Sequence, residues 1–213
     1  MSHTVHPYSF RLGILRNWKS RWFNLKKYRI LLRGDVLLRE WMEKRLRGMC
    51  VDSIEIERSP EILRVIVKTS RPGLVIGRKG EGADRLKLQV EKFLRKNKVE
   101  EQRRVDVVVE EVKRPETRAA IVSQMVAESL EKRLPFRRVM KQTLDKVMAN
   151  KEVKGVKLAL SGRLAGAEMS RREWLSRGKM PLQTLTADVD FAKERAHLPY
   201  GDIGIKVWIY REE

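Results

Sequence analysis

Two glycines that bracket two basic residues, in Gly77-Arg78-Lys79-Gly80, constrain the fold of this chain more than any other short stretch. Apolar residues precede them and a segment with helical periodicity follows. Because glycine lacks a Cβ, its backbone can adopt angles that other residues avoid and can approach another molecule closely. Two cations held between such glycines suit a chain of phosphates. Four residues are weak support alone, so the flanking segments decide the interpretation.

The flanking segments predict a definite order of elements. A helix with Asp35 as its N-cap is expected first, because apolar residues follow it at helical spacing. Strands are expected over 51–58 and 62–69, separated by a Ser-Pro turn. A short apolar run then leads into the glycine loop. An apolar stripe over 83–94 predicts a helix, and alternation over 105–109 predicts a closing strand.

This order resembles the type II, prokaryotic arrangement of the KH fold, in which a glycine loop lies between two helices. In KH domains that loop clamps about four nucleotides. The resemblance implies an α+β fold with a KH domain over 21–114, built from a three-stranded sheet with helices on one face. It also implies that Gly77, Arg78, Lys79 and Gly80 bind RNA.

The rest of the chain predicts a second domain over 115–213. Pro115 marks the boundary, and a Leu-Pro pair separates two helical patterns. Alternating apolar residues follow in several short runs, so two helices should precede a mostly antiparallel sheet. The expected helices cover 116–133 and 136–149, and the expected strands cover 154–160, 185–191 and 203–210.

The charge balance favours a polyanionic partner. The chain has 47 Lys and Arg against 28 Asp and Glu, a net charge of +19 and a pI near 10.3. Nucleic acid and an anionic membrane are the two candidates, but neither a transmembrane run, a signal peptide nor an amphipathic anchor is predicted. Cys50 is the single cysteine, so no disulfide and no cysteine-based metal site is expected. The reducing environment of the cytoplasm is the expected location.

The N-terminal segment is basic throughout. Residues 1–34 carry eight Lys or Arg and no acid. Residues 1–20 are predicted to be an extended arm that stays mobile until RNA orders it, or else a solvated tail. Trp18, Trp22 and Phe23 argue against a tail, because they should pack on the core or stack on bases.

The C-terminal half carries a specific string of residues. It includes Trp174, Pro181-Leu182, Ala187-Asp188 and Tyr200-Gly201. The string begins with Gly162-Arg163-Leu164-Ala165-Gly166-Ala167-Glu168 and ends with Gly204-Ile205-Lys206-Val207-Trp208-Ile209. Together with His6-Pro7 and Phe10-Arg11-Leu12-Gly13-Ile14, it closely resembles the universal S-three family of the bacterial small ribosomal subunit.

That resemblance implies a ribosomal function. Such proteins bind small-subunit rRNA in the head, line the channel through which mRNA enters, and help to open mRNA helices. Their Arg-Arg-x-x-Lys pattern is matched by Arg137, Arg138 and Lys141; from spacing alone an ordinary solvated helix face, with Asp145 paired to one of these cations, is equally expected. Proteins of the S-ten and S-fourteen families are the implied neighbours. The candidate rRNA contacts are Arg11, Arg16, Lys19, Arg21, Arg163, Arg171, Arg172, Arg177 and Lys179.

Two other functions are considered. Asp188 and Asp190 share a strand face, an arrangement that suits the metal ligands of a nuclease, although an ordinary exposed strand face also explains them. A free-standing KH regulator of mRNA is the other alternative. No phosphate-binding G-x-x-x-x-G-K-[ST] loop is present, and no catalytic residue, metal, cofactor or small-molecule substrate is expected.

Overall fold

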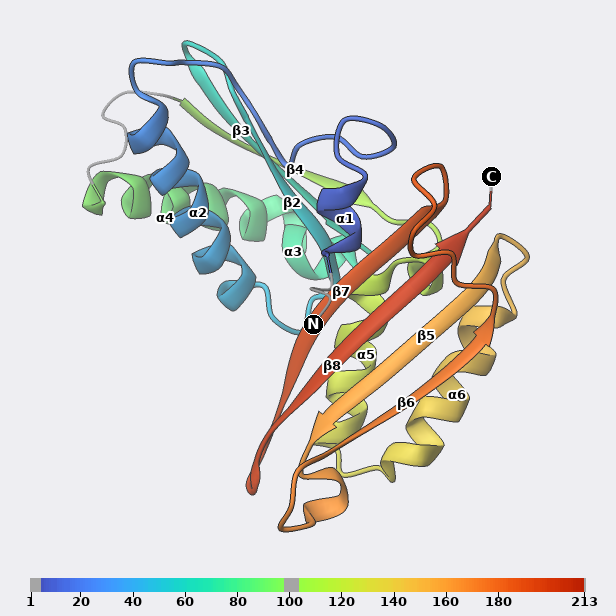
Figure 1. The fold of residues 1–213 in the computed structure, drawn as a ribbon. Coiled ribbons are helices and arrows are strands. Elements are labelled where there is room, and N and C mark those ends of the chain that lie inside the picture. The colour runs from blue at the N-terminus through green and yellow to red at the C-terminus, as the bar shows by residue number, and fades with distance from the viewer. Residues whose placement is uncertain (1–4, 98–103, 213) are drawn as a thin grey trace. The chain divides into compact units, whose positions relative to one another are not determined.

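The computed structural model describes residues 5–97 and 104–212 and divides the chain into two compact units. One unit is Trp18–Lys113, and the other combines the described part of Met1–Asn17 with Arg114–Glu213. Figure 1 shows a sheet with helices in each unit. The prediction of an α+β fold is confirmed. Among the described residues, no helix is both long and apolar enough to span a membrane.

The first unit follows the predicted order of elements. Its sheet has the order β1-β2-β3-β4, in which β2 is antiparallel to β3, and β1 and β4 run parallel to their neighbours. The elements are β1 (Ser20–Arg21), α2 (Tyr28–Arg45), β2 (Val51–Arg58), β3 (Ile62–Thr69), α3 (Pro72–Ile76), a 3₁₀ turn η1 (Arg78–Gly80), α4 (Glu81–Lys96) and β4 (Arg104–Glu111). The two-residue strand β1 therefore adds a fourth, edge strand to the predicted three.

Helices cover one face of this sheet because apolar residues occupy alternate strand positions. Ile54, Ile56, Leu63 and Val65 are fully or almost fully buried and belong to one apolar cluster with residues of α2 and α4. The other members of that cluster are Leu38, Met42, Leu46, Val67, Val75, Leu86, Val90, Leu94 and Val105. The arrangement places the glycine loop between α3 and α4.

The prediction that Asp35 is an N-cap is wrong. Helix α2 begins at Tyr28, and Asp35 lies inside it with no exposed surface. The Asp35 carboxylate accepts hydrogen bonds from the Arg58 guanidinium, at 2.5 and 2.8 Å, and from the Trp22 indole nitrogen, at 2.7 Å. A buried charge is tolerated where such partners satisfy it. This contact joins α2 to β2 and fixes Trp22 beside the sheet.

The second unit places its helices before its sheet in the chain, as predicted. All neighbouring strands are antiparallel, in the order β6-β5-β8-β7. Its elements are α1 (Pro7–Phe10), the 3₁₀ turn η2 (Pro115–Thr117), α5 (Ala119–Glu131), α6 (Phe136–Met148), β5 (Val153–Gly162), the 3₁₀ turn η3 (Leu164–Gly166), β6 (Arg171–Gly178), β7 (Asp188–Leu198) and β8 (Gly201–Arg211).

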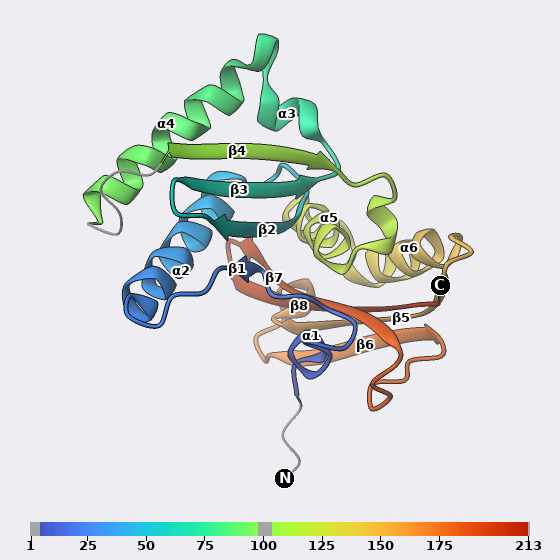
Figure 2. The same ribbon diagram turned by 90° about the horizontal axis from the view of Figure 1, so that it is seen from above.

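The two faces of this second sheet have different cover. Figure 2 shows α5 and α6 on one side and the short α1 on the other. The main core lies under the two long helices, where residues such as Leu158, Leu160, Ile205 and Val207 are buried. The opposite side, here called the outer sheet face, has only a small apolar cluster around Val189 and Trp208.

The N-terminal residues are not a separate arm. Residues 5–17 belong to the second unit, where α1 contacts β7 and the His6 ring packs edge-on against Phe191 at 4.8 Å. Residues 1–4 of the predicted arm lie outside the described residues. The described residues of this segment pack against the second unit and do not extend away from it.

We predict that Asp35→Ala strongly destabilises the first unit. The change leaves the buried Arg58 guanidinium without the carboxylate that faces it, which typically costs about 3–5 kcal/mol. Native-state hydrogen exchange of the β3 amides measures the loss. Arg64→Ala is the control, because its ion pairs with Glu57 and Asp106 are half-exposed and should contribute no more than about 1 kcal/mol. Equal protection in the two variants would contradict this role for Asp35.

Candidate RNA-binding surfaces

The glycine loop is a tight connection between α3 and α4. Gly77 and Gly80 have positive φ angles of 71° and 87°, and Lys79 between them has a φ of 52°. Positive φ values favour glycine and disfavour residues with a β-branched side chain. The loop therefore turns within four residues and presents both of its cations outward.

Close packing of the two helices behind the loop sets its shape. A Cβ added to Gly82 would lie 2.6 Å from the Val75 carbonyl oxygen, so only glycine fits there. Arg78 and Lys79 are exposed and form no ion pair with any described residue. Glu81 lies in the first turn of α4, where a carboxylate interacts favourably with the helix dipole. Two exposed cations therefore precede the helix terminus.

Helix α6 presents the predicted Arg-Arg-x-x-Lys cations to solvent. Its buried side is formed by Phe136, Val139, Met140, Leu144 and Val147. Arg137, Arg138 and Lys141 are exposed on other sides of the helix. Because the apolar side is fixed against the core, these three cations project from a rigid support.

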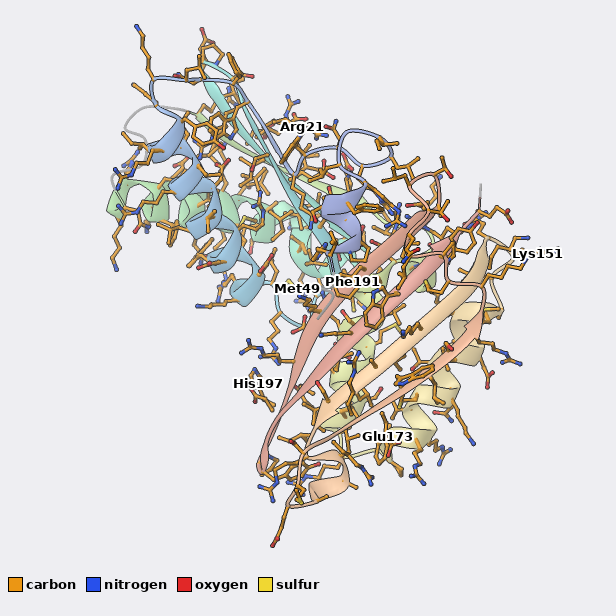
Figure 3. The ribbon with its side chains drawn as sticks, in the orientation of Figure 1. Arg21, Met49, Lys151, Glu173, Phe191 and His197 are labelled. Atoms are coloured by element: carbon orange, nitrogen blue, oxygen red, sulfur yellow. The ribbon has the colours of Figure 1, made fainter. Side chains whose placement is uncertain are left out.

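Strand β6 brings more arginines beside α6. Arg171 lies over the Phe136 ring, 5.5 Å from its centre, and its Nε is 3.3 Å from a Glu173 oxygen. Arg137 lies 3.6 Å from the same carboxylate (Figure 3 labels Glu173). We call Arg137, Arg138, Lys141, Arg171 and Arg177, together with the neighbouring Glu173, the α6–β6 surface.

The predicted partner of Asp145 is wrong. Asp145 pairs with Arg177 of β6 rather than with a cation of its own helix. The pairing is across elements because β6 runs alongside α6. No strand is predicted over residues 171–178, so the sequence does not place Arg171 near Arg137 or Arg177 near Asp145. The two apolar residues of this strand, Trp174 and Leu175, are adjacent, so the sequence shows no alternation there.

Arg11 is a structural residue, which corrects its prediction as an rRNA contact. Its side chain has no exposed surface, and its guanidinium donates hydrogen bonds to the backbone carbonyls of Ala187, Pro7, Pro181, Leu182 and Thr184 at 2.6–3.3 Å. Burial lowers the pKa of this guanidinium below its ordinary value, and the charge of Asp188 acts in the opposite direction. An arginine with these contacts is closed to phosphate.

The other N-terminal cations differ in their availability. Arg16 is mostly buried and pairs with Asp188 at 2.5 Å, so its guanidinium is already engaged within the second unit, against its predicted rRNA contact. Arg21, labelled in Figure 3, pairs at 2.8 Å with both Glu55 and Glu57 but keeps about a third of its side chain exposed. Lys19 is exposed.

The remaining predicted contacts lie around the ends of β5 and β6. Arg163 donates to the carbonyls of Ala167 and Tyr200, at 2.9 and 3.2 Å, and so holds the turn after β5. Arg172 and Lys179 are exposed and have no ion pair with a described residue. Only Arg163 of these three is therefore tied to the protein backbone.

The two aspartates that suggested a metal site have structural partners. Asp188 bonds to Arg16 and to Arg211, and Asp190 accepts a hydrogen bond at 2.8 Å from the amide of Ala119 at the start of α5. Within residues 5–97 and 104–212, no group of three or more His, Cys, Asp or Glu could hold a metal ion. The pair therefore supports packing of the sheet.

Comparisons with known proteins decide the family. A family model described as "Ribosomal protein S3, C-terminal domain" matches residues 126–209, and a model of the KH domain matches residues 37–117. The chain is 44% identical over 213 residues to the small ribosomal subunit protein uS3 of Syntrophomonas wolfei, covering 100% of this chain and 90% of that protein. It is 45% identical to the uS3 of Lawsonia intracellularis, covering 100% of this chain and 96% of its relative.

The chain belongs to the uS3 family. It is thus a structural component of the small ribosomal subunit with an RNA-binding KH domain, and it is not an enzyme. The nuclease alternative is thereby removed. The KH match spans α2 to η2 and includes the glycine loop, while the C-terminal match includes α6, β6 and the sheet.

We predict that Arg11→Ala loosens the N-terminal residues without changing the salt dependence of RNA binding. Removing the guanidinium leaves buried carbonyls without donors, which should cost at least about 2 kcal/mol. Limited proteolysis of residues 7–17 and thermal unfolding measure the effect. Arg33→Ala, at an exposed helix position, should leave both unchanged. A stable variant with a shallower salt slope would restore Arg11 as an RNA contact.

Proposed function

We propose that the α6–β6 surface contacts incoming mRNA in the small subunit and favours its unpaired form. The observation that carries this proposal is the placement of Arg138 and Lys141. They are exposed on a helix whose other side is locked in the core, and neither forms an ion pair with any described residue. Membership of the uS3 family supports the ribosomal setting.

The proposed mechanism is electrostatic. Each phosphate neutralised on a single strand releases counterions, and the logarithm of affinity falls by about 0.7 per contact for each decade of salt. A separated strand can bend so that successive phosphates meet Arg137, Arg138 and Lys141, which is harder for a stiff duplex. The surface thus lowers the free energy of the open strands, while movement of the message supplies the work.

Exposed cations apart from Arg137, Arg138 and Lys141 are proposed to hold small-subunit rRNA in the head, and two of them, Arg171 and Arg177, lie on the α6–β6 surface. These cations lie in both units, and head proteins of the S-ten and S-fourteen families are the proposed protein neighbours. Arg21 and Arg163 would act with part of their guanidinium already engaged by protein. The proposed contacts are Lys19, Arg21, Arg163, Arg171, Arg172, Arg177 and Lys179.

The glycine loop is proposed to bind single-stranded RNA. Its geometry supports this. Gly77 and Gly80 have no side chain that would block approach of RNA to the loop backbone, and the Arg78 and Lys79 side chains are exposed. The amino terminus of α4 follows directly and adds a favourable dipole for a phosphate.

We predict that changing Arg137, Arg138 and Lys141 to Ala slows translation through stable mRNA hairpins by severalfold but spares unstructured messages. The reason is that the loss affects only open strands that must be held apart. Single-ribosome translation on matched messages measures the pause at the hairpin. The control replaces Lys113, Lys132 and Lys151 by Ala, which removes the same charge from exposed positions elsewhere. Equal slowing on both messages would overturn the proposal.

We predict that Arg78→Asp with Lys79→Asp weakens binding of a short single strand at least tenfold at low salt, because two contacts become repulsive. Aspartate tolerates the positive φ of Lys79, so the domain should keep its fold. Fluorescence anisotropy gives the affinity, and circular dichroism checks the fold. Lys92→Asp with Lys96→Asp, on the solvent side of α4, gives the same change of net charge. If the control weakens binding equally, the loop has no specific role.

A further inference from the structure

The outer sheet face of the second unit carries a group of aromatic and basic side chains that the surfaces above do not use, apart from Arg172. Strand pairing places Trp174, Ala159, Lys206 and Lys193 in one row across β6, β5, β8 and β7. Because alternate residues of a strand point to opposite faces, these four side chains share the face opposite α5 and α6.

The neighbouring rows complete the site. On one side of Trp174 and Ala159 lie Ser176 and Lys157, and on the other lie Arg172 and Ser161. The next residue beyond Ser161 in that row is Gly204 of β8. Small residues, Ala159, Ser161 and Gly204, therefore lie beside the indole ring of Trp174, and basic side chains surround them.

Trp174 is held in place yet remains open to solvent. The Lys157 ammonium lies 5.1 Å from the centre of its ring and 5.5 Å from that of the buried Trp208, in a cation–π arrangement with both. The Trp174 residue nevertheless keeps 57% of its surface exposed. The N-terminal residues pack over Phe191 of β7, at the other edge of the sheet (Figure 3).

The charged side chains on these rows are all basic. Lys157, Arg172, Lys193 and Lys206 form no ion pair with any described residue, although the chain makes many such pairs elsewhere. Among the side chains on the rows described above there is no carboxylate. An exposed aromatic ring beside unneutralised cations on a sheet is the arrangement that binds unpaired bases and their phosphates.

We propose that the outer sheet face binds a single-stranded RNA segment, with a base stacked on Trp174 and the flanking phosphates on Arg172 and Lys206. This inference rests on the proposed rRNA-binding function and adds to it a site, a strand state and a stacking residue. A duplex does not satisfy the site, because paired bases cannot present a free face to the ring.

The test compares two RNAs bound by the full-length chain. One is a twelve-uridine strand, and the other has the same length and charge but lacks bases. Stacking contributes to the first alone, so Trp174→Ala should lower the ratio of the two affinities by at least about fivefold. Trp174→Phe should keep most of that ratio. Leu185→Ala, an exposed apolar position outside these rows, should keep all of it.

The outcomes separate this inference from the proposed function. An unchanged ratio in Trp174→Ala, or equal weakening with both RNAs, overturns the stacking site while RNA binding itself stands. Failure of the wild-type chain to bind either RNA at low salt overturns the proposed function.

The assembled subunit gives a second readout. Trypsin cleaves after Arg172 and Arg177, which releases Trp174 in a five-residue peptide. Ultraviolet crosslinking of small subunits should leave a nucleotide on that peptide. A crosslink from it to another protein would instead show a protein partner on this face and overturn the inference.

Discussion

Repulsion among 47 lysines and arginines is the constraint that the rest of the structure depends on. The 28 carboxylates cannot neutralise all of them, so where the acids lie decides which cations stabilise the fold. Asp188 lies between Arg16 and Arg211, and Glu55 lies between Arg21 and Lys68. Each of these acids joins segments that are distant in sequence. The cations that remain exposed are then the ones available to a polyanion.

Backbone carbonyls replace a carboxylate around Arg11. Its guanidinium has donors directed into a fixed fork, and the turn between Pro181 and Ala187 supplies acceptors in matching directions. Desolvation lowers its pKa, but an arginine starts so high that it keeps its charge inside the protein. A lysine at this position would present a point charge without the fork geometry and could satisfy fewer of these carbonyls. The contact therefore fixes the beginning of the chain on β7 by geometry as well as charge.

The sequence predicted the elements whose apolar residues face a core in a regular period. The expected strands 51–58 and 62–69 have the same bounds as β2 and β3, and the expected helix 136–149 differs from α6 by one residue. Periodicity failed where it was incomplete. The first turns of α2 expose Tyr28, Ile30 and Leu32, so they lack a helical stripe. The second half of β7 and all of β6 are largely polar and exposed, which hides their alternation.

Site residues were harder to predict, because whether a basic side chain is free to meet RNA depends on its contacts with distant parts of the chain. Arg11 and Arg16 look like any other basic residue of a polybasic segment, yet Ala187 and Asp188, which they contact, are more than 170 residues away. Arg137, Arg138 and Lys141 were singled out by their match to the family pattern, while periodicity placed all three on one helix beside an apolar side. Their proximity to residues of β6 was not predicted, because that pairing requires the sheet to be known.

Ion pairs on the α6–β6 surface are weak enough to exchange with RNA. Arg137 is 3.6 Å from Glu173 and 71% of its side chain is exposed, so water and salt screen this attraction. A phosphate approaching Arg137 displaces a contact that contributes little, whereas one approaching Arg58 would have to break a buried pair with Asp35. The same residue type is thus structural or available according to its desolvation. That difference follows from which arginines the sheets and helices cover, and it separates the cations that stabilise the two units from those that remain open to ribonucleate.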